Sequence, residues 1–126
     1  MMAMIPRKRV LIADDESDLR VLLRETIRDR YDVCEAADGG EAIRLAAALR
    51  PDAVVLDIHM PGTDGLTVCR WLKTNPPLAT IRVILTSRRI APGGDEACLD
   101  LGADYFLPKP FTPPALRQLL QIACRG

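Results

Sequence analysis

Short apolar runs alternate along this chain with stretches in which apolar residues recur at the spacing of a helix. The runs have the length of strands, and they cover residues 10–13, 31–36, 53–56, 81–86 and 105–108. The first and third runs are apolar on both faces, as central strands covered by helices must be. The second run is more polar, which is typical of a strand at the edge of a sheet.

The stretches between these runs predict five helices. Apolar residues at positions 19, 22, 23 and 27 mark the first helix, with Arg20 and Arg24 facing away from the core and Ser17 or Asp15 as its cap. The other helices are expected over 41–49, over 66–74, over a short stretch at 95–101, and from Thr112 onward. Two prolines follow Thr112, in positions that suit the first turn of a helix.

Strands that alternate with helices predict an α/β fold built from βαβ units, with a mostly parallel sheet. Right-handed crossovers place helices on both faces of that sheet. We expect the strand order 2-1-3-4-5, which makes the first and third strands neighbours at the point where the order reverses. The length of 126 residues fits one domain over 1–126, with an ordered core over about 8–124.

Composition narrows the classes of partner. Seventeen basic and seventeen acidic side chains give a formal net charge of zero, so no field favours direct nucleic-acid binding. No uncharged apolar run reaches the roughly 18 residues that a membrane span needs, so no membrane insertion is expected. The first residues lack the pattern of a secretory signal, and we expect a cytoplasmic protein.

Polar residues suited to phosphoryl chemistry follow four of the five strands. Asp14 and Asp15 follow the first, Asp57 follows the third, Thr86 ends the fourth and Lys109 follows the fifth. The carboxyl ends of parallel strands meet at one edge of a sheet, where α/β proteins bind ligands. The five side chains are therefore expected to form one site.

The residue types predict the chemistry of that site. Three neighbouring carboxylates repel one another unless a cation lies between them, and oxygen ligands alone favour a hard ion such as Mg²⁺. Lys109 and Thr86 would contact phosphate oxygens through a charge and a hydroxyl. An attacking carboxylate would form an acyl phosphate. Taken singly, the aspartate pair could be a helix cap, Thr86 a strand former and Lys109 a solvated turn residue.

The chain resembles the receiver domain of two-component response regulators over essentially its whole length. The stretches that carry the resemblance are 11–16, 57–65 and 102–111. It implies a flavodoxin-like three-layer sandwich of five parallel strands and five helices. It also implies that Asp57 is the phosphoacceptor, which receives its phosphoryl group from a sensor histidine kinase or a histidine phosphotransfer protein.

The same resemblance implies further roles. Asp15, Asp57 and the backbone carbonyl of His59 would bind Mg²⁺, or Mn²⁺ as a substitute, and Asp14 would act through metal-bound water. Thr86 and Phe106 would form a switch that changes the surface of the fourth helix, fifth strand and fifth helix. That surface would bind a downstream protein or a missing output domain. A cis peptide between Lys109 and Pro110 and a monomer or weak homodimer are also expected.

Two residues depart from the commonest pattern of the family. His59 lies two residues after Asp57, and Arg88 lies two residues after Thr86. Both are expected at the water-accessible rim of the phosphoryl group. The hypothesis is that they restrict the attacking water and lengthen the lifetime of the acyl phosphate.

Other functions remain open at this stage. A phosphorelay shuttle would hand the phosphoryl group to another histidine without an output of its own. A Mg²⁺-dependent phosphohydrolase of haloacid-dehalogenase type would need a second aspartate at the position of His59. A degenerate receiver would bind partners without phosphorylation, but the complete acidic set argues against it. We expect a phosphoacceptor switch, not an enzyme beyond self-catalysed phosphotransfer and autodephosphorylation.

Overall fold

A five-stranded parallel sheet forms the centre of the computed structural model, which describes residues 7–88 and 102–125. The strand order is β2-β1-β3-β4-β5, as predicted. The strands are β1 (Arg9–Ala13), β2 (Asp32–Ala36), β3 (Ala53–Asp57), β4 (Arg82–Ser87) and β5 (Tyr105–Pro108). The sheet therefore has the topology of the flavodoxin-like fold that the sequence predicts.

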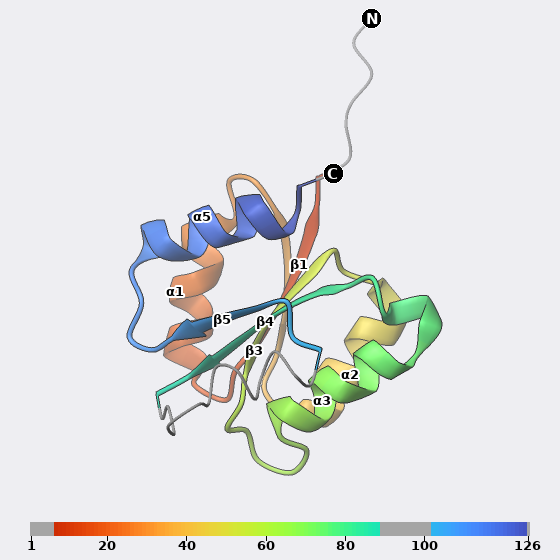
Figure 1. Ribbon diagram of the computed structural model, residues 1–126. Helices are drawn as coiled ribbons and strands as arrows, with labels where there is room; N and C mark the ends of the chain where they lie inside the picture. The colour runs from red at the N-terminus through yellow and green to blue at the C-terminus, as the bar shows by residue number, and fades with distance from the viewer. Residues whose placement is uncertain (1–6, 89–101, 126) are drawn as a thin grey trace, which may run out of the picture.

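Helices cover both faces of this sheet (Figure 1). They are α1 (Ser17–Ile27), α2 (Gly39–Leu49), α3 (Gly65–Thr74) and α5 (Pro113–Ala123), with a short 3₁₀ helix, η1 (Pro76–Leu78), after α3. The helix expected over 95–101 lies outside the described residues. In the described part of the chain, no helix has the length and apolarity that a membrane crossing requires.

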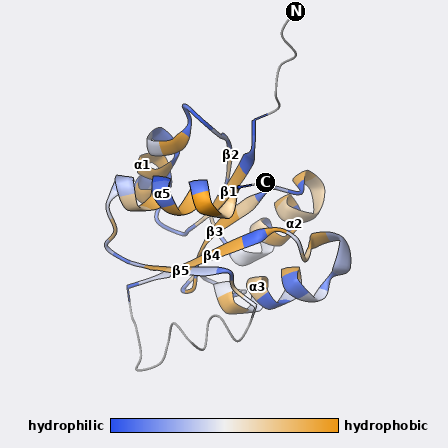
Figure 2. Ribbon diagram, turned by 45° about the horizontal axis from the view of Figure 1, so that its top comes forward, coloured by the Kyte–Doolittle hydropathy of each residue, from blue (hydrophilic) through white to orange (hydrophobic). Residues whose placement is uncertain are grey.

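Successive strand residues point to opposite faces, and this alternation produces two cores. On one face Leu11, Val54 and Leu85 pack with α2 and α3. On the other face Ile12 and Ile84 pack with α1 and α5. Figure 2 shows the result, with hydrophobic strands at the centre and helices that are hydrophobic on one side only. The buried position of β1 and β3 explains their unbroken apolar sequence.

The helix starts differ in part from the predictions. Neither Ser17 nor Asp15 caps α1, because Glu16 occupies the N-cap position and makes no side-chain capping bond. Helix α2 begins at Gly39, two residues before the predicted start at 41, because the Asp38 side chain accepts a 2.8 Å hydrogen bond from the Glu41 N–H. Helix α5 begins as predicted.

Helix α3 is anchored directly against the end of β3. The Gly65 N–H donates a 2.8 Å hydrogen bond to the Ile58 carbonyl, and a Cβ atom at Gly65 would lie 2.1 Å from the Asp57 carbonyl oxygen. Only glycine fits such a close approach. The loop between Asp57 and Gly65 is therefore held at both ends.

Candidate functional site

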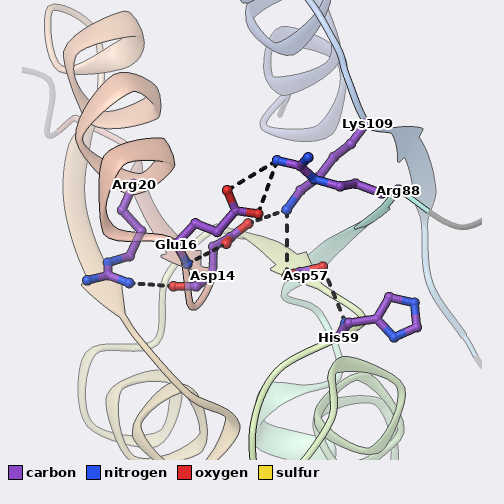
Figure 3. Close-up of polar contacts among 7 residues, drawn as sticks. All are labelled: Asp14, Glu16, Arg20, Asp57, His59, Arg88 and Lys109. Carbon is purple, nitrogen blue, oxygen red and sulfur yellow. Dashed lines mark hydrogen bonds and ion pairs between the residues drawn. The ribbon is translucent and has the colours of Figure 1, made fainter.

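Two buried aspartates meet one buried lysine at the carboxyl edge of the sheet. Asp14 follows β1 and Asp57 ends β3, and these two strands are hydrogen-bonded neighbours. The Lys109 ammonium nitrogen lies 2.7 Å from Asp14 Oδ2 and 3.6 Å from Asp57 Oδ2 (Figure 3). The Lys109 side chain is 5% exposed. Residues from three strand ends thus form one cluster.

The cluster lacks enough positive charge for its acids. Burial raises the pKa of Asp57, and the neighbouring carboxylates of Asp14 and Asp15 raise it further. Lys109 and the His59 N–H, which donates a 3.3 Å hydrogen bond to Asp57 Oδ1, lower the pKa without cancelling the rise. The ionised form of such a carboxylate is stabilised by any cation that enters the site.

Exposed acidic side chains lie beside the buried pair. Carboxylate oxygens of Asp14, Asp15 and Glu16 all lie within 4.8 Å of one another, close enough to share one metal ion. Asp57 is not part of this compact group, and Glu16, which the sequence analysis did not single out, belongs to it. Oxygen donors alone suit a hard ion such as Mg²⁺, so this donor set fits the metal that the sequence implies.

An open cleft gives access to these groups. Its volume is about 330 Å³, and it is lined by Asp15, Glu16, Asp57, His59, Arg88 and Lys109. A small phosphorylated group can enter such a cleft and reach the Asp57 carboxylate. The cleft holds both metal-ligand candidates and the lysine expected to contact phosphate.

His59 and Arg88, which the sequence analysis expected at the rim of the phosphoryl group, both line the cleft. His59 is exposed. Arg88 Nη2 lies 3.2 and 3.1 Å from the two carboxylate oxygens of Glu16, so the pair bridges the mouth of the cleft (Figure 3). The predictions did not include this pair. The Lys109–Pro110 peptide bond is cis.

The two expected switch residues lie on neighbouring strands. Thr86 is buried and stands opposite Asp57 in the register of β3 and β4. Phe106 stands opposite Leu85 in the register of β4 and β5, and it is half-buried against the core on the side of α2 and α3. Neither side chain is among the residues that line the cleft.

Sequence reasoning missed a set of ion pairs behind the site. It placed Arg20 and Arg24 on the solvent face of α1, but both turn toward Glu35 on the edge strand β2. Arg20 Nε lies 3.4 Å from Glu35 Oε1, and Arg24 Nη1 lies 2.6 Å from Glu35 Oε2. An acidic residue in the edge strand, together with arginines four residues apart on the preceding helix, was the available signal.

Known proteins resemble this chain in sequence. The family model described as "Response regulator receiver domain" matches residues 10–121. Response regulator MprA of Mycolicibacterium vanbaalenii is 43% identical over 113 residues, which are 89% of this chain and 47% of that protein. The same-named protein of Mycobacterium ulcerans is 42% identical over the same shares. This chain spans about half the length of the curated relatives it matches.

Solved structures match the fold. A putative response regulator from Chloroflexus aurantiacus has a TM-score of 0.89 at 28% identity and covers 96% of this chain and 100% of that one. The receiver domain of a histidine kinase from Syntrophus aciditrophicus has a TM-score of 0.87 at 32% identity and covers 94% and 91%. Chemotaxis protein CheY4 of Vibrio cholerae has a TM-score of 0.87 at 28% identity and covers 94% and 99%.

The fold, the acidic cleft and the family match lead to one class of protein. The chain belongs to the response regulator receiver domain family. Members of this family are signalling switches of two-component systems, and the chain is to be understood as such a receiver domain.

Proposed function

We propose that Asp57 accepts a phosphoryl group from a phosphohistidine on a sensor histidine kinase or a histidine phosphotransfer protein. The observation that carries the proposal is the position of Asp57 itself. Its carboxylate is buried with a raised pKa, lies 3.6 Å from the Lys109 ammonium, and lines a cleft that opens to solvent. Such a group is poised to act as a nucleophile toward an entering phosphoryl group.

The transfer forms one bond and breaks another. An Asp57 carboxylate oxygen attacks phosphorus, and the bond between phosphorus and the donor imidazole nitrogen breaks. The bonding electron pair returns to the ring. The second ring nitrogen already carries a proton, so the leaving group is a neutral imidazole. Lys109 lies where its charge stabilises the phosphoryl oxygens, and the buried Thr86 hydroxyl on the adjacent strand is proposed to bond one of them after a rearrangement.

A divalent metal completes this proposal. Asp15, Asp57 and the His59 backbone carbonyl would hold Mg²⁺, or Mn²⁺ in its place, and Asp14 would contact its bound water. The ion, when bound, supplies positive charge that offsets the carboxylates and the phosphoryl oxygens. The exposed Asp15 carboxylate beside buried Asp14 supports this assignment.

The proposed output is a change of surface. We infer that Thr86 moves toward the phosphoryl group and that Phe106 moves inward. The surface of β5 and α5 then presents a new face to a downstream protein or to an output domain of a longer chain, and the remaining part of the expected surface, over 95–101, lies outside the described residues. Phe106 is half-buried and lies on β5, which pairs with β4, the strand that carries Thr86. This arrangement supports a coupling between the two side chains. We expect this exchange to take place in the cytoplasm, where ATP supplies kinases.

The decisive experiment is phosphorylation by acetyl phosphate in the presence of Mg²⁺, followed by intact-mass measurement. The wild type should gain the mass of one phosphoryl group, and Asp57→Asn should gain none. Removal of Mg²⁺ by a chelator should abolish the gain. Asp104→Asn, a change of another partly buried aspartate that does not line the cleft, is the matched control and should be phosphorylated as the wild type is. An unchanged gain in Asp57→Asn would contradict the proposal.

A second experiment tests the roles proposed for His59 and Arg88. Both line the mouth through which water must reach an acyl phosphate on Asp57. We expect His59→Asn and Arg88→Ala to lose the phosphoryl group faster than the wild type, because the route for water is wider. Unchanged or slower loss in both variants would show that neither residue protects the bond.

A further inference from the structure

Arg20 connects the acidic turn of the cleft to the edge of the sheet. It lies in α1, yet its side chain turns back toward the end of β1 (Figure 3). Its Nη1 donates a 2.5 Å hydrogen bond to the backbone carbonyl oxygen of Asp14. The Arg20 side chain is only 17% exposed. A cationic donor in a partly buried position makes a strong hydrogen bond.

Every polar group of Asp14 has a partner, and Arg20 supplies the last one. The Asp14 N–H donates to the Ala36 carbonyl at 3.0 Å. Its carboxylate accepts from the Glu16 N–H at 2.9 Å and from Lys109 at 2.7 Å. These three bonds fix Asp14 relative to β2, β5 and its own turn. The Arg20 bond fixes the remaining group, the carbonyl.

The carbonyl of Asp14 controls the direction in which the chain reaches Asp15. The peptide bond that joins Asp14 to Asp15 is planar, so the carbonyl oxygen of Asp14 and the N–H of Asp15 rotate together. A bond that holds the oxygen therefore holds the plane from which the Asp15 side chain departs. Asp15 is exposed, and its carboxylate is expected, with that of Asp57, to bind the metal directly.

Glu35 holds the Arg20 guanidinium in this orientation. Its Oε1 lies 3.4 Å from Arg20 Nε, while Arg24 binds its other oxygen at 2.6 Å. The guanidinium is planar and rigid, so a contact at Nε also directs Nη1 toward the carbonyl. Arg24 shares Glu35 but has no bond to the turn among the described contacts. The chain thus provides its own control residue.

We propose that Arg20 is a positioning residue for the metal-binding turn over 14–16, acting through the Asp14 carbonyl and anchored by Glu35. The proposal rests on the metal-dependent function proposed above. If Arg20 acted through its charge alone, its removal would change the Mg²⁺ affinity in the opposite direction, because a nearby cation repels Mg²⁺. Loss of positioning weakens metal binding, whereas loss of a repelling charge strengthens it.

The test is a Mg²⁺ titration of the full chain. Isothermal titration calorimetry measures the affinity, and the backbone amide NMR signals of Asp15 and Glu16 report binding at the turn. Arg20→Met should weaken Mg²⁺ binding about tenfold, the lower end of the effect of removing a partner behind a metal ligand. Arg20→Lys keeps the charge but cannot hold both partners, so it should recover only part of this loss. Arg24→Met removes an equal charge from Glu35 and should change the Mg²⁺ affinity less than about twofold.

Urea denaturation without metal separates stability from positioning. Each variant removes one arginine from Glu35, and Arg20→Met also leaves the Asp14 carbonyl without its donor, so Arg20→Met should lose the more stability of the two. Equal or tighter Mg²⁺ binding by Arg20→Met, or equal weakening by Arg24→Met, would overturn the proposal. If Arg20→Met does not fold, Arg20→Lys decides by the same comparison with Arg24→Met. Absence of Mg²⁺ binding by the wild type would instead overturn the metal site itself, and acetyl phosphate would then fail in parallel.

Discussion

Two aspartates at opposite edges of the sheet have opposite electrostatic states. Asp57 ends β3 at the carboxyl edge, whereas Asp104 precedes β5 at the amino edge. Asp104 Oδ2 accepts hydrogen bonds from Lys73 at 2.8 Å and from the Val83 N–H at 2.9 Å, and its Oδ1 accepts from Arg82 at 3.2 Å. Asp57 instead shares one lysine with a second buried carboxylate.

The pKa values of the two groups follow this difference. Burial alone would raise the pKa of Asp104, but the hydrogen bonds from Lys73, Val83 and Arg82 outweigh burial and lower it. Burial raises the pKa of Asp57, and the neighbouring Asp14 adds to the rise. Burial acts in the same direction at both positions, so the partners decide the outcome. The contacts of Asp104 stabilise the fold. The carboxylate of Asp57 is not fully neutralised by its neighbours, so a cationic ligand would stabilise it.

The largest expected effect comes from removing the cation of the stabilising site. Lys73 also donates to the carbonyls of Ala79 and Ile81, at 3.2 and 2.7 Å, so Lys73→Met leaves several partly buried acceptors without a partner. We expect a loss of about 2 to 3 kcal/mol in the free energy of unfolding, measured with urea. A loss below about 0.5 kcal/mol would mean that water replaces the lysine at little cost.

The sharpest comparison is the same substitution at both positions, in metal-free buffer. Asp104→Asn removes a charge that three donors stabilise and should lower the free energy of unfolding by about 1 to 2 kcal/mol. Asp57→Asn removes a charge from a buried like-charge pair and should raise it, on the order of 1 kcal/mol. Chemical denaturation of the two variants beside the wild type gives both signs. Two changes of the same sign would refute the electrostatic distinction.

The placement of Asp14, Asp57 and Lys109 was predictable because strand order alone brings their backbones together. Parallel strands end at one edge, so no knowledge of side-chain packing was needed. The partners of Asp104 were not predictable in this way. Lys73 lies 31 positions away in the sequence and reaches it from α3, through contacts that only the packed helix creates.

The errors on α1 and α2 have local causes. Arg20 was assigned to solvent from its polarity, but the edge strand offers Glu35 as a partner on that side. The second helix was predicted to begin at residue 41, after Gly39, because glycine is a poor helix former. In the structure Gly39 starts α2, where a Cβ would lie 2.0 Å from the Thr63 carbonyl oxygen. Glycine is required at this position by the close packing against Thr63, and its low helix propensity does not prevent the helix from starting there.

The two sites should also respond to pH on opposite sides of the ordinary aspartate pKa of about 3.9. The folded-state pKa of Asp104 lies below the unfolded value, so its contribution is complete above about pH 4 and is lost as the pH falls further. The folded-state pKa of Asp57 lies above the unfolded value, so its cost to stability appears as the pH rises above about 4.

Unfolding free energies measured between about pH 3 and 7 test this expectation, because each asparagine variant removes one titration. The difference between wild type and Asp104→Asn should change mainly below about pH 4, and the difference between wild type and Asp57→Asn mainly above it. Each change is part of the full substitution effect and is therefore smaller. Parallel curves over the whole range would show that neither pKa shift contributes.

The smallest expected effect concerns the exposed arginine of each site. Arg82 is 53% exposed and Arg88 is 67% exposed, and each pairs with one carboxylate from solvent. Water and salt screen such pairs, so Arg82→Met should lower the free energy of unfolding by less than about 0.5 kcal/mol. Arg88→Met should have a similarly small effect on stability, although its partner Glu16 belongs to the cleft. Urea denaturation at low and high salt measures both. A large, salt-resistant loss in Arg82→Met would mean that the exposed arginine, and not Lys73 beneath it, holds Asp104 in its ionised state.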